Sequence, residues 1–184
     1  MTNLATVPDP PDGFGRPDPH DLAAEQAVLG AMMLSAAAAE TCRSALGADD
    51  FYRPAHSLIF ASITAMMLAS EPVDALTVKD HLEAGGELAR CQGAPYLHTL
   101  IASVPVTANA ANYARIVREH AVRRRLLLAG RRILQWAGGG TGDDGHGLTE
   151  RAMREIEAAR DAGQDDDVTA QTITEFLAGE DSDD

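Results

Sequence analysis

The stretch from Ala108 to Ala137 constrains the fold most strongly, because it reads as one uninterrupted helix. Thr107 offers an N-cap at its start, and a glycine-rich loop from Gly138 to Gly147 follows its end. At about 1.5 Å per residue such a helix is ~45 Å long, which exceeds what a compact domain of this size requires. We therefore expect it to project from the main core or to pack against something outside that core.

A second helix is predicted from Leu148 to about Ala162, and it would return along the first to form a helical hairpin. The apolar residues available for the inner faces are few: Leu126, Leu127, Ile133 and Leu134 on the long helix, with Leu148, Met153 and Ile156 opposite. Two helices that share so little apolar area are not expected to be stable alone. Ala129 and Gly130 add two small residues at which another helix could approach closely. We therefore predict that a second copy completes the hairpin through an oligomer interface of Leu126, Leu127, Gly130, Ile133, Leu134, Met153 and Ile156.

Shorter helices are predicted before the hairpin. Asp21 and Ser35 begin the first two, Pro54 suits the first turn of a third, Asp74 caps a fourth, and a fifth begins near Pro95. Aromatic residues make up only 4% of the chain, so the core must be built from aliphatic side chains and Met, which suits close-packed helices. Alternating runs of β-branched residues are nearly absent. The predicted class is therefore all-α, with a small globular helical bundle followed by a projecting helical hairpin.

The chain divides into four expected segments. Residues 1–18 are rich in Pro, Asp and Gly and are expected to be a disordered leader. Residues 19–106 form the bundle and 107–163 the hairpin, which acts as a dimerisation arm. Residues 164–184 form an acidic tail, in which Thr169 to Ala178 is expected to form a short amphipathic helix. Acidic tails of this kind are usually solvating and disordered, and the alternative is a tail that binds a partner.

The net charge of −13 is unevenly distributed. Residues 1–142 hold 14 acidic and 12 basic residues, whereas residues 143–184 hold 14 acidic and 3 basic residues. The long helix has the opposite charge, with seven arginines and one glutamate between Tyr113 and Ala137. Three roles are open for these arginines: ion pairs with Glu150, Glu155, Glu157 and Asp161 of the returning helix or with a neighbouring protomer, phosphate contacts near DNA, or simple solvation. The candidate partner or DNA contacts are Arg123, Arg124, Arg125, Arg131 and Arg132.

Nothing in the sequence predicts catalysis, a metal or a cofactor. The sequence contains no GxxxxGK[ST] phosphate loop, and its only lysine is Lys79. Residues 140–145 match GxGxxG, but they follow an arginine-rich helix and carry two aspartates, so we interpret them as a hairpin turn. The six histidines lack metal-ligand spacing, and Cys42 and Cys91 lie far apart as expected for reduced thiols. Without a signal peptide or a membrane-length apolar run, the expected location is the cytoplasm.

Several short motifs occur in an order that identifies a family. Residues 19–33 read PHDLAAEQAVLGAMM, and residues 49–60 read DDFYRPAHSLIF. Further matching positions are Pro72-Val73-Asp74, Gly93 with Tyr96-Leu97, Pro105 with Asn109, and Tyr113-Ala114. Together they resemble the N-terminal domain of DnaB-type replicative helicases from about Pro19 to Ala137. The structural positions of this signature are Glu25, Gly30, Phe51, His56, Phe60, Asn109 and Tyr113, and a structural hydrogen bond is the preferred role for His56.

The resemblance implies a function in DNA replication. In this family the hairpins pair into dimers and three dimers form a ring, on which primase docks and whose state loader proteins sense; ATP chemistry belongs to a separate ATPase domain. We therefore predict an oligomerising scaffold, a dimer or a hexamer, that binds primase, a helicase loader or a separate helicase ATPase, with only indirect contact to DNA and none to membrane. The alternatives are a regulator that co-assembles with a complete helicase and a protein that binds DNA through the arginine helix. The acidic end favours a stand-alone protein over a remnant or a shortened helicase.

Overall fold

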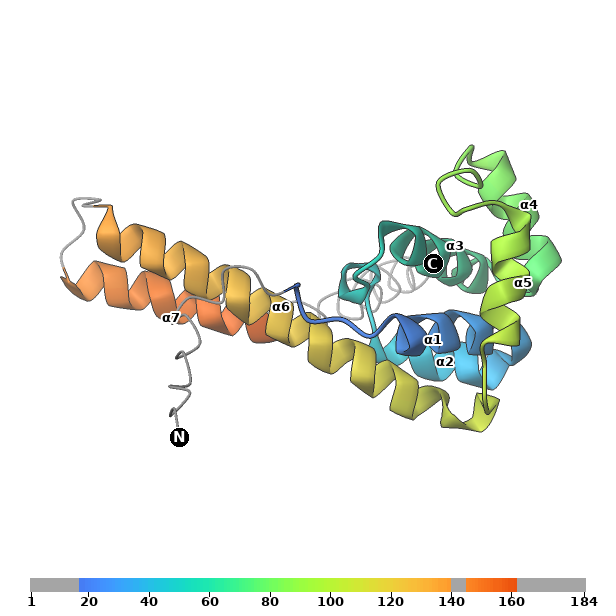
Figure 1. Cartoon of the computed structure of the whole chain (residues 1–184), viewed down its shortest axis with the longest axis horizontal. Helices are drawn as coiled ribbons and strands as arrows, with labels where there is room; N and C mark the ends of the chain where they lie inside the picture. Colours follow the sequence, from blue (N-terminus) through green and yellow to red (C-terminus); the bar gives the residue numbers. More distant parts are fainter. Residues whose placement is uncertain (1–16, 140–144, 162–184) are drawn as a thin grey trace, which may run out of the picture.

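The structure is a computed structural model that describes residues 17–139 and 145–161. Within those residues it contains helices and turns but no strand, so the all-α prediction is confirmed. The α-helices are α1 (Leu22–Leu34), α2 (Ala36–Ala45), α3 (Pro54–Leu68), α4 (Ala75–Ala84), α5 (Ala94–Ala102), α6 (Ala110–Gly138) and α7 (Gly145–Asp161), with 3-10 turns η1 (Ala48–Asp50) and η2 (Thr107–Asn109). Helices α1 to α5 form a bundle, and the second half of α6 runs out of it beside α7 (Figure 1).

Side-chain caps start three of the bundle helices where the sequence predicts them. The Asp21 carboxylate accepts a hydrogen bond from the backbone N–H of Ala24, and the Ser35 hydroxyl accepts one from Ala38. Asp74 accepts from the first backbone N–H groups of α4, while Pro54 occupies the first turn of α3. These contacts satisfy donors that have no partner within the helix itself. The local chemistry therefore fixes where each helix begins.

Two predicted boundaries in the hairpin are wrong. Thr107 does not cap α6, because residues 107–109 form the turn η2 and the N-cap position falls on Asn109, whose side chain makes no capping hydrogen bond. Helix α7 begins at Gly145 rather than at Leu148, and the Thr149 hydroxyl donates a hydrogen bond to the carbonyl of Gly145. The connecting loop is therefore shorter than the sequence suggests. The leader at 1–16, most of the GxGxxG segment (140–144) and the predicted tail helix lie outside the described residues.

Helix α1 lies at the centre of the core. It packs against α2, α3, α5 and α6, and its Val28, Leu29 and Ala31 have no solvent exposure. Small residues on the first half of α6 allow that helix to lie close against α1 and α2, namely Ala110, Ala114, Val117 and Ala121. One helix therefore belongs to both parts of the molecule, since its first half completes the bundle and its second half builds the hairpin (Figure 1).

Replacing Gly30 with alanine is expected to destabilise the bundle. A Cβ atom at this position would clash with the backbone carbonyl of Leu100 and would lie 2.5 Å from Cγ2 of Val104, so α1 and α5 would have to separate. Such overpacking costs about 1–3 kcal/mol of unfolding free energy, which urea unfolding measures. The control is Gly138→Ala at the end of α6, outside the predicted interface, where a Cβ would meet no described atom within 4 Å. That change should stabilise the helix by up to ~1 kcal/mol, and equal effects of the two substitutions would contradict the packing argument.

Candidate functional site

A buried carboxylate joins the bundle to α6. Asp50 has no solvent exposure, and its Oδ2 accepts the backbone N–H of Gly47 at 2.9 Å and Nη1 of Arg118 at 3.4 Å. Its Oδ1 accepts from Arg125, and its backbone carbonyl accepts from Nη2 of Arg124 at 2.5 Å. A buried charge needs this degree of pairing, because desolvation would otherwise disfavour the ionised form. We call Asp50 with Arg118, Arg124 and Arg125 the arginine clasp.

Arg124 extends the clasp to the chain segment before α1. Its Nη1 donates to the carbonyl oxygen of Pro19 at 2.8 Å, and its guanidinium lies 5.8 Å from the ring centroid of Tyr52. The His20 ring stacks on the same Tyr52 ring, with the two centroids 4.2 Å apart. Burial lowers the pKa of the Arg124 guanidinium, because the site is partly shielded from water. The Arg124 side chain therefore makes its contacts within its own chain.

The other predicted arginine contacts are distributed around α6. Arg132 pairs with Glu155 of α7 at 2.5 Å, which is one of the partners considered from the sequence. Arg131 lies 3.6 Å from a carboxylate oxygen of Asp18, and Arg123 is exposed. Sequence reasoning missed Asp50 as the main acidic partner. Asp50 lies 68 residues before Arg118 in the chain, so no local pattern pairs the two. The only sequence signal at Asp50 is its place in the signature motif.

The contact between α6 and α7 uses small and polar residues. Ala129 and Ala159 are buried, Arg132 pairs with Glu155, and the guanidinium of Arg151 lies 3.9 Å above the Trp136 ring. The sequence predicts that seven apolar residues face one another across the hairpin, and for five of them this is wrong, because Leu126, Leu127, Leu134, Met153 and Ile156 are exposed. The other two, Ile133 and Leu148, are half-buried. Only the two alanines are fully buried in this contact and the larger side chains are at most half-buried, so the contact buries little apolar area.

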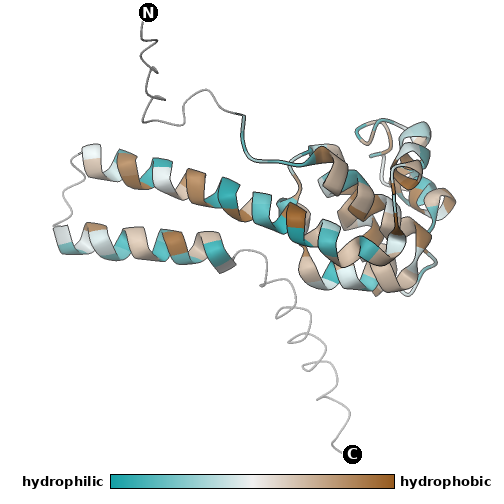
Figure 2. Cartoon of the chain, turned by 60° about the horizontal axis from the view of Figure 1, so that its bottom comes forward, coloured by the Kyte–Doolittle hydropathy of each residue, from teal (hydrophilic) through white to brown (hydrophobic). Residues whose placement is uncertain are grey.

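Five of the exposed apolar residues instead lie on one side of the hairpin, whereas Leu128 lies on the other side. Successive residues of a helix are rotated by about 100°, and Ala129 marks the face of α6 that contacts α7. Measured from Ala129, the α6 members of these five all lie to the same side. Met153 and Ile156 of α7 point to that side as well. Leu134 is 69% exposed and Met153 is 58% exposed, and a Cβ at Gly130 would meet no described atom within 4 Å. Figure 2 shows hydrophobic segments recurring along both helices of the hairpin. With the half-buried Gly130 and Ile133 on the same side, these residues form what we call the apolar flank: Leu126, Leu127, Gly130, Ile133, Leu134, Met153 and Ile156.

A second buried polar group lies inside the bundle. Glu25 Oε2 lies 2.5 Å from Nδ1 of His56, and the other His56 nitrogen lies 2.6 Å from the Tyr96 hydroxyl. That hydroxyl already accepts from Gln26 at 3.2 Å and from Arg53 at 3.1 Å. Its own hydrogen therefore goes to Nε2, which leaves the proton of a neutral His56 on Nδ1, donating to Glu25. Sequence reasoning assigned His56 a structural hydrogen bond but did not identify Tyr96 as a partner.

This network fixes the start of α3. The Glu25 carboxylate also accepts the backbone N–H groups of Tyr52 at 2.7 Å and Arg53 at 3.4 Å, immediately before that helix. Glu25 and His56 are fully buried within the bundle, whereas Tyr96 is partly exposed. The arrangement joins α1, α3 and α5. Its polar groups form hydrogen bonds with one another and with the nearby backbone, which is typical of a structural network.

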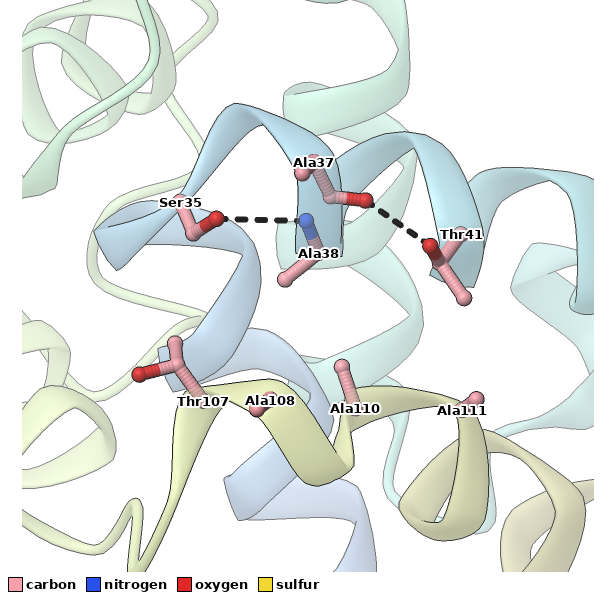
Figure 3. Close-up of a pocket in the computed structure, with 8 residues that line it drawn as sticks. All are labelled: Ser35, Ala37, Ala38, Thr41, Thr107, Ala108, Ala110 and Ala111. Atoms are coloured by element: carbon pink, nitrogen blue, oxygen red, sulfur yellow. Dashed lines mark hydrogen bonds between the residues drawn. The ribbon is translucent and has the colours of Figure 1, made fainter.

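A hollow of about 330 Å³ lies between α2 and the beginning of α6 (Figure 3). Most of its lining is alanine, and the two hydroxyls of α2 that reach it are bonded locally, Ser35 to the N–H of Ala38 and Thr41 to the carbonyl of Ala37. Burial raises the pKa of the nearby Cys42 thiol to about 11, so it stays protonated at neutral pH. The hollow therefore presents methyl groups and no reactive side chain.

The chain matches known proteins over most of its length. Residues 17–119 match the family described as DnaB-like helicase N terminal domain. The chain belongs to this family. It is 48% identical over 156 residues to the replicative DNA helicase DnaB of Mycobacterium leprae, which covers 84% of this chain and 26% of that protein. The chain therefore spans about a quarter of the length of that relative.

Solved structures agree with the assignment. The crystal structure of the N-terminal domain of DnaB helicase from Mycobacterium tuberculosis is 47% identical, with a TM-score of 0.72, and the match covers 77% of this chain and 99% of that one. A DnaB-like replicative helicase, described with its interactions with primase, shares the fold at 21% identity and a TM-score of 0.62, over 89% of this chain and 36% of that one. The likeness to a helicase thus covers its N-terminal domain, and no ATPase domain is matched.

The family-signature residues occupy mostly structural positions in this domain. Glu25, Gly30, Phe51, His56 and Phe60 are buried in the bundle, Tyr113 packs against its core, and Asn109 is exposed before α6. Among the described residues there is no cluster of three His, Cys, Asp or Glu side chains that could hold a metal ion, and no helix is long and apolar enough to cross a membrane. The features left exposed for interaction are the apolar flank and the outer surface of the bundle.

Proposed function

We propose that this chain is an oligomerising scaffold of DNA replication, equivalent to the collar of a replicative helicase, and that it self-associates through the apolar flank. The observation that carries the proposal is the exposure of five large apolar residues of this flank on a hairpin that fully buries only Ala129 and Ala159. Contiguous exposed apolar surface of this kind marks a protein interface. A two-fold dimer would let the same flank face itself.

Its partners would be other replication proteins. A relative of the same fold is described with its interactions with primase, which supports a primase, a loader or a separate helicase ATPase as the partner class. The chain would provide the docking platform, while nucleotide hydrolysis would belong to an ATPase domain. The arginine helix gives less support to a DNA-binding role, since Arg124, Arg125 and Arg132 have partners within the chain.

Light scattering during size-exclusion chromatography tests self-association directly. We expect the mass to be a multiple of the 19.4 kDa monomer, a dimer or a hexamer, and to fall on dilution as mass action requires. A monomer at every concentration would contradict a self-assembling collar. That result would favour the alternative in which the hairpin pairs with the N-terminal domain of a complete helicase and tunes its activity, which titration into a helicase assay would reveal.

A further inference from the structure

A groove follows the seam between α3 and α4, at the end of the molecule opposite the hairpin tip (Figure 1). It consists of two hollows that share His81 in their lining. One, of about 250 Å³, lies beside the connection between the two helices and includes Glu71 and Asp80. The other, of about 230 Å³, lies toward the end of α4 and includes Ser62 and Glu87. We call the two hollows together the α3–α4 groove.

Two exposed apolar side chains lie on the helices that form this groove. Leu68 and Leu76 are each 66% exposed, and they are the two most exposed large apolar residues of the bundle. Leu68 follows Ala61 and Ala65 at helical spacing, so it extends the strip of α3 that lines one hollow. Leu76 lies one helical turn before Asp80, which lines the other hollow. The two exposed leucines therefore lie near the connection between α3 and α4.

One polar atom in the groove lacks a hydrogen bond. Ser62 is only 7% exposed, and its Oγ has no hydrogen-bond partner among the described residues. A buried hydroxyl without a partner carries a desolvation cost that a hydrogen bond from an incoming group would remove. This hydroxyl lies in the lining of the hollow that also contains Glu87 and the end of α4. On the α3 side of this hollow, the Ser62 hydroxyl is thus an unsatisfied polar group among apolar side chains.

The charge of this region favours a cationic partner. Residues 54–102 carry five acidic and two basic residues, whereas α6 carries seven basic residues and one acidic residue. Glu71, Asp80 and Glu87 all line the groove. The half-buried Lys79 pairs with Asp80 and Glu83, and the exposed Arg90 pairs with Glu87, so five acidic residues still exceed the two basic ones in this region. Nucleic acid phosphates would be repelled from the same surface.

We propose that the α3–α4 groove docks an amphipathic α-helix of a partner protein, with its apolar face against Leu68 and Leu76 and flanking Lys or Arg side chains on the acidic rim. Apolar residues at helical spacing suit a groove bordered by exposed leucines, and basic flanks suit the three carboxylates. The inference rests on the proposed scaffold role and names the surface and the partner chemistry. It is separate from self-association, because the groove and the apolar flank share no residue.

The test uses the full chain and two synthetic helical peptides. Both carry leucines on one face, and the flanking positions are lysine in one peptide and glutamate in the other. Fluorescence anisotropy should show binding of the lysine peptide only. The variant Leu76→Ser with Asp80→Lys, two exposed positions, should weaken that binding at least ~10-fold, because both an apolar and a charged contact are removed.

A matched control separates docking from general attraction to an acidic protein. Glu40→Lys on α2 changes the net charge as Asp80→Lys does, at a side chain of similar exposure, but lies outside the groove. It should leave peptide affinity within ~2-fold of the parent, as expected for a screened distant charge. Equal losses for Glu40→Lys and for the double variant Leu76→Ser with Asp80→Lys, or undiminished binding by that double variant, would overturn the proposal. The mass of each variant, measured alongside, reports on self-association independently.

Discussion

Replacing Asp50 with alanine is expected to reduce the unfolding free energy by about 3–5 kcal/mol, the range found when one partner of a buried ion pair is removed. The change leaves Arg118 and Arg125 at the interface between the bundle and α6 without the carboxylate that both contact. One guanidinium nitrogen of Arg125 is already buried without a partner among the described residues, so little remains to compensate its charge. Because a domain is typically stable by only ~5–15 kcal/mol, this is a large share of the total.

The neighbouring acidic residue provides a matched control. Asp49 lies in the same turn η1 but is exposed, so Asp49→Ala should change stability by less than ~0.5 kcal/mol. Asp50→Asn keeps an oxygen that can accept hydrogen bonds and should fall between the two. Urea unfolding followed by circular dichroism at one fixed protein concentration measures all three. An Asp50→Ala variant within ~1 kcal/mol of the parent would show that the arginines re-solvate and that the clasp contributes little.

The arginine clasp also shows where sequence reasoning stops. Helix starts at Asp21, Ser35 and Asp74 follow from the sequence because a cap and its backbone donor lie within three residues of each other. Asp50 and Arg125 are 75 residues apart, and nothing in their local patterns pairs them. The acids of α7 were the nearer candidates in sequence, but only Glu155 pairs with an arginine of α6 in the contacts described above. Long-range partners of charged residues depend on how the bundle packs, which a single sequence does not specify.

The hairpin was predicted correctly as an element and incorrectly in its rotation. Hydrophobicity suggested that Leu127 and Leu134 face α7, whereas the structure places Ala129 and Ala159 there. The rotation of α6 is set by its first half, where Ala114, Val117 and Ala121 must face the bundle. A rigid helix carries that phase into its second half, and the leucines consequently point away from α7. The exposure of the leucines thus follows from how the first half of α6 packs against the bundle. This is why the sequence identifies the candidate interface residues but not the side of the hairpin on which they lie.

Replacing Leu127 and Leu134 with aspartate is expected to dissociate the oligomer while the bundle stays folded. Each leucine buried in an interface contributes ~1.5–3 kcal/mol, and a two-fold dimer contains each position twice. Four such losses, with four carboxylates that resist desolvation, should raise the dissociation constant by at least ~1000-fold. Light scattering should then report the monomer mass, while circular dichroism and the unfolding midpoint of the bundle should stay near those of the parent.

The same helix offers a control at identical spacing. Leu128 and Gln135 follow Leu127 and Leu134 by one residue, which rotates them about 100° around α6 to the other side of the hairpin. Leu128 is 49% exposed and Leu127 is 42% exposed, so Leu128→Asp with Gln135→Asp adds the same charge to an equally accessible pair of positions. If the apolar flank forms the interface, this control keeps the parent mass. Dissociation by both pairs would mean that added negative charge alone disrupts assembly, and dissociation by neither pair would place the interface elsewhere on the molecule.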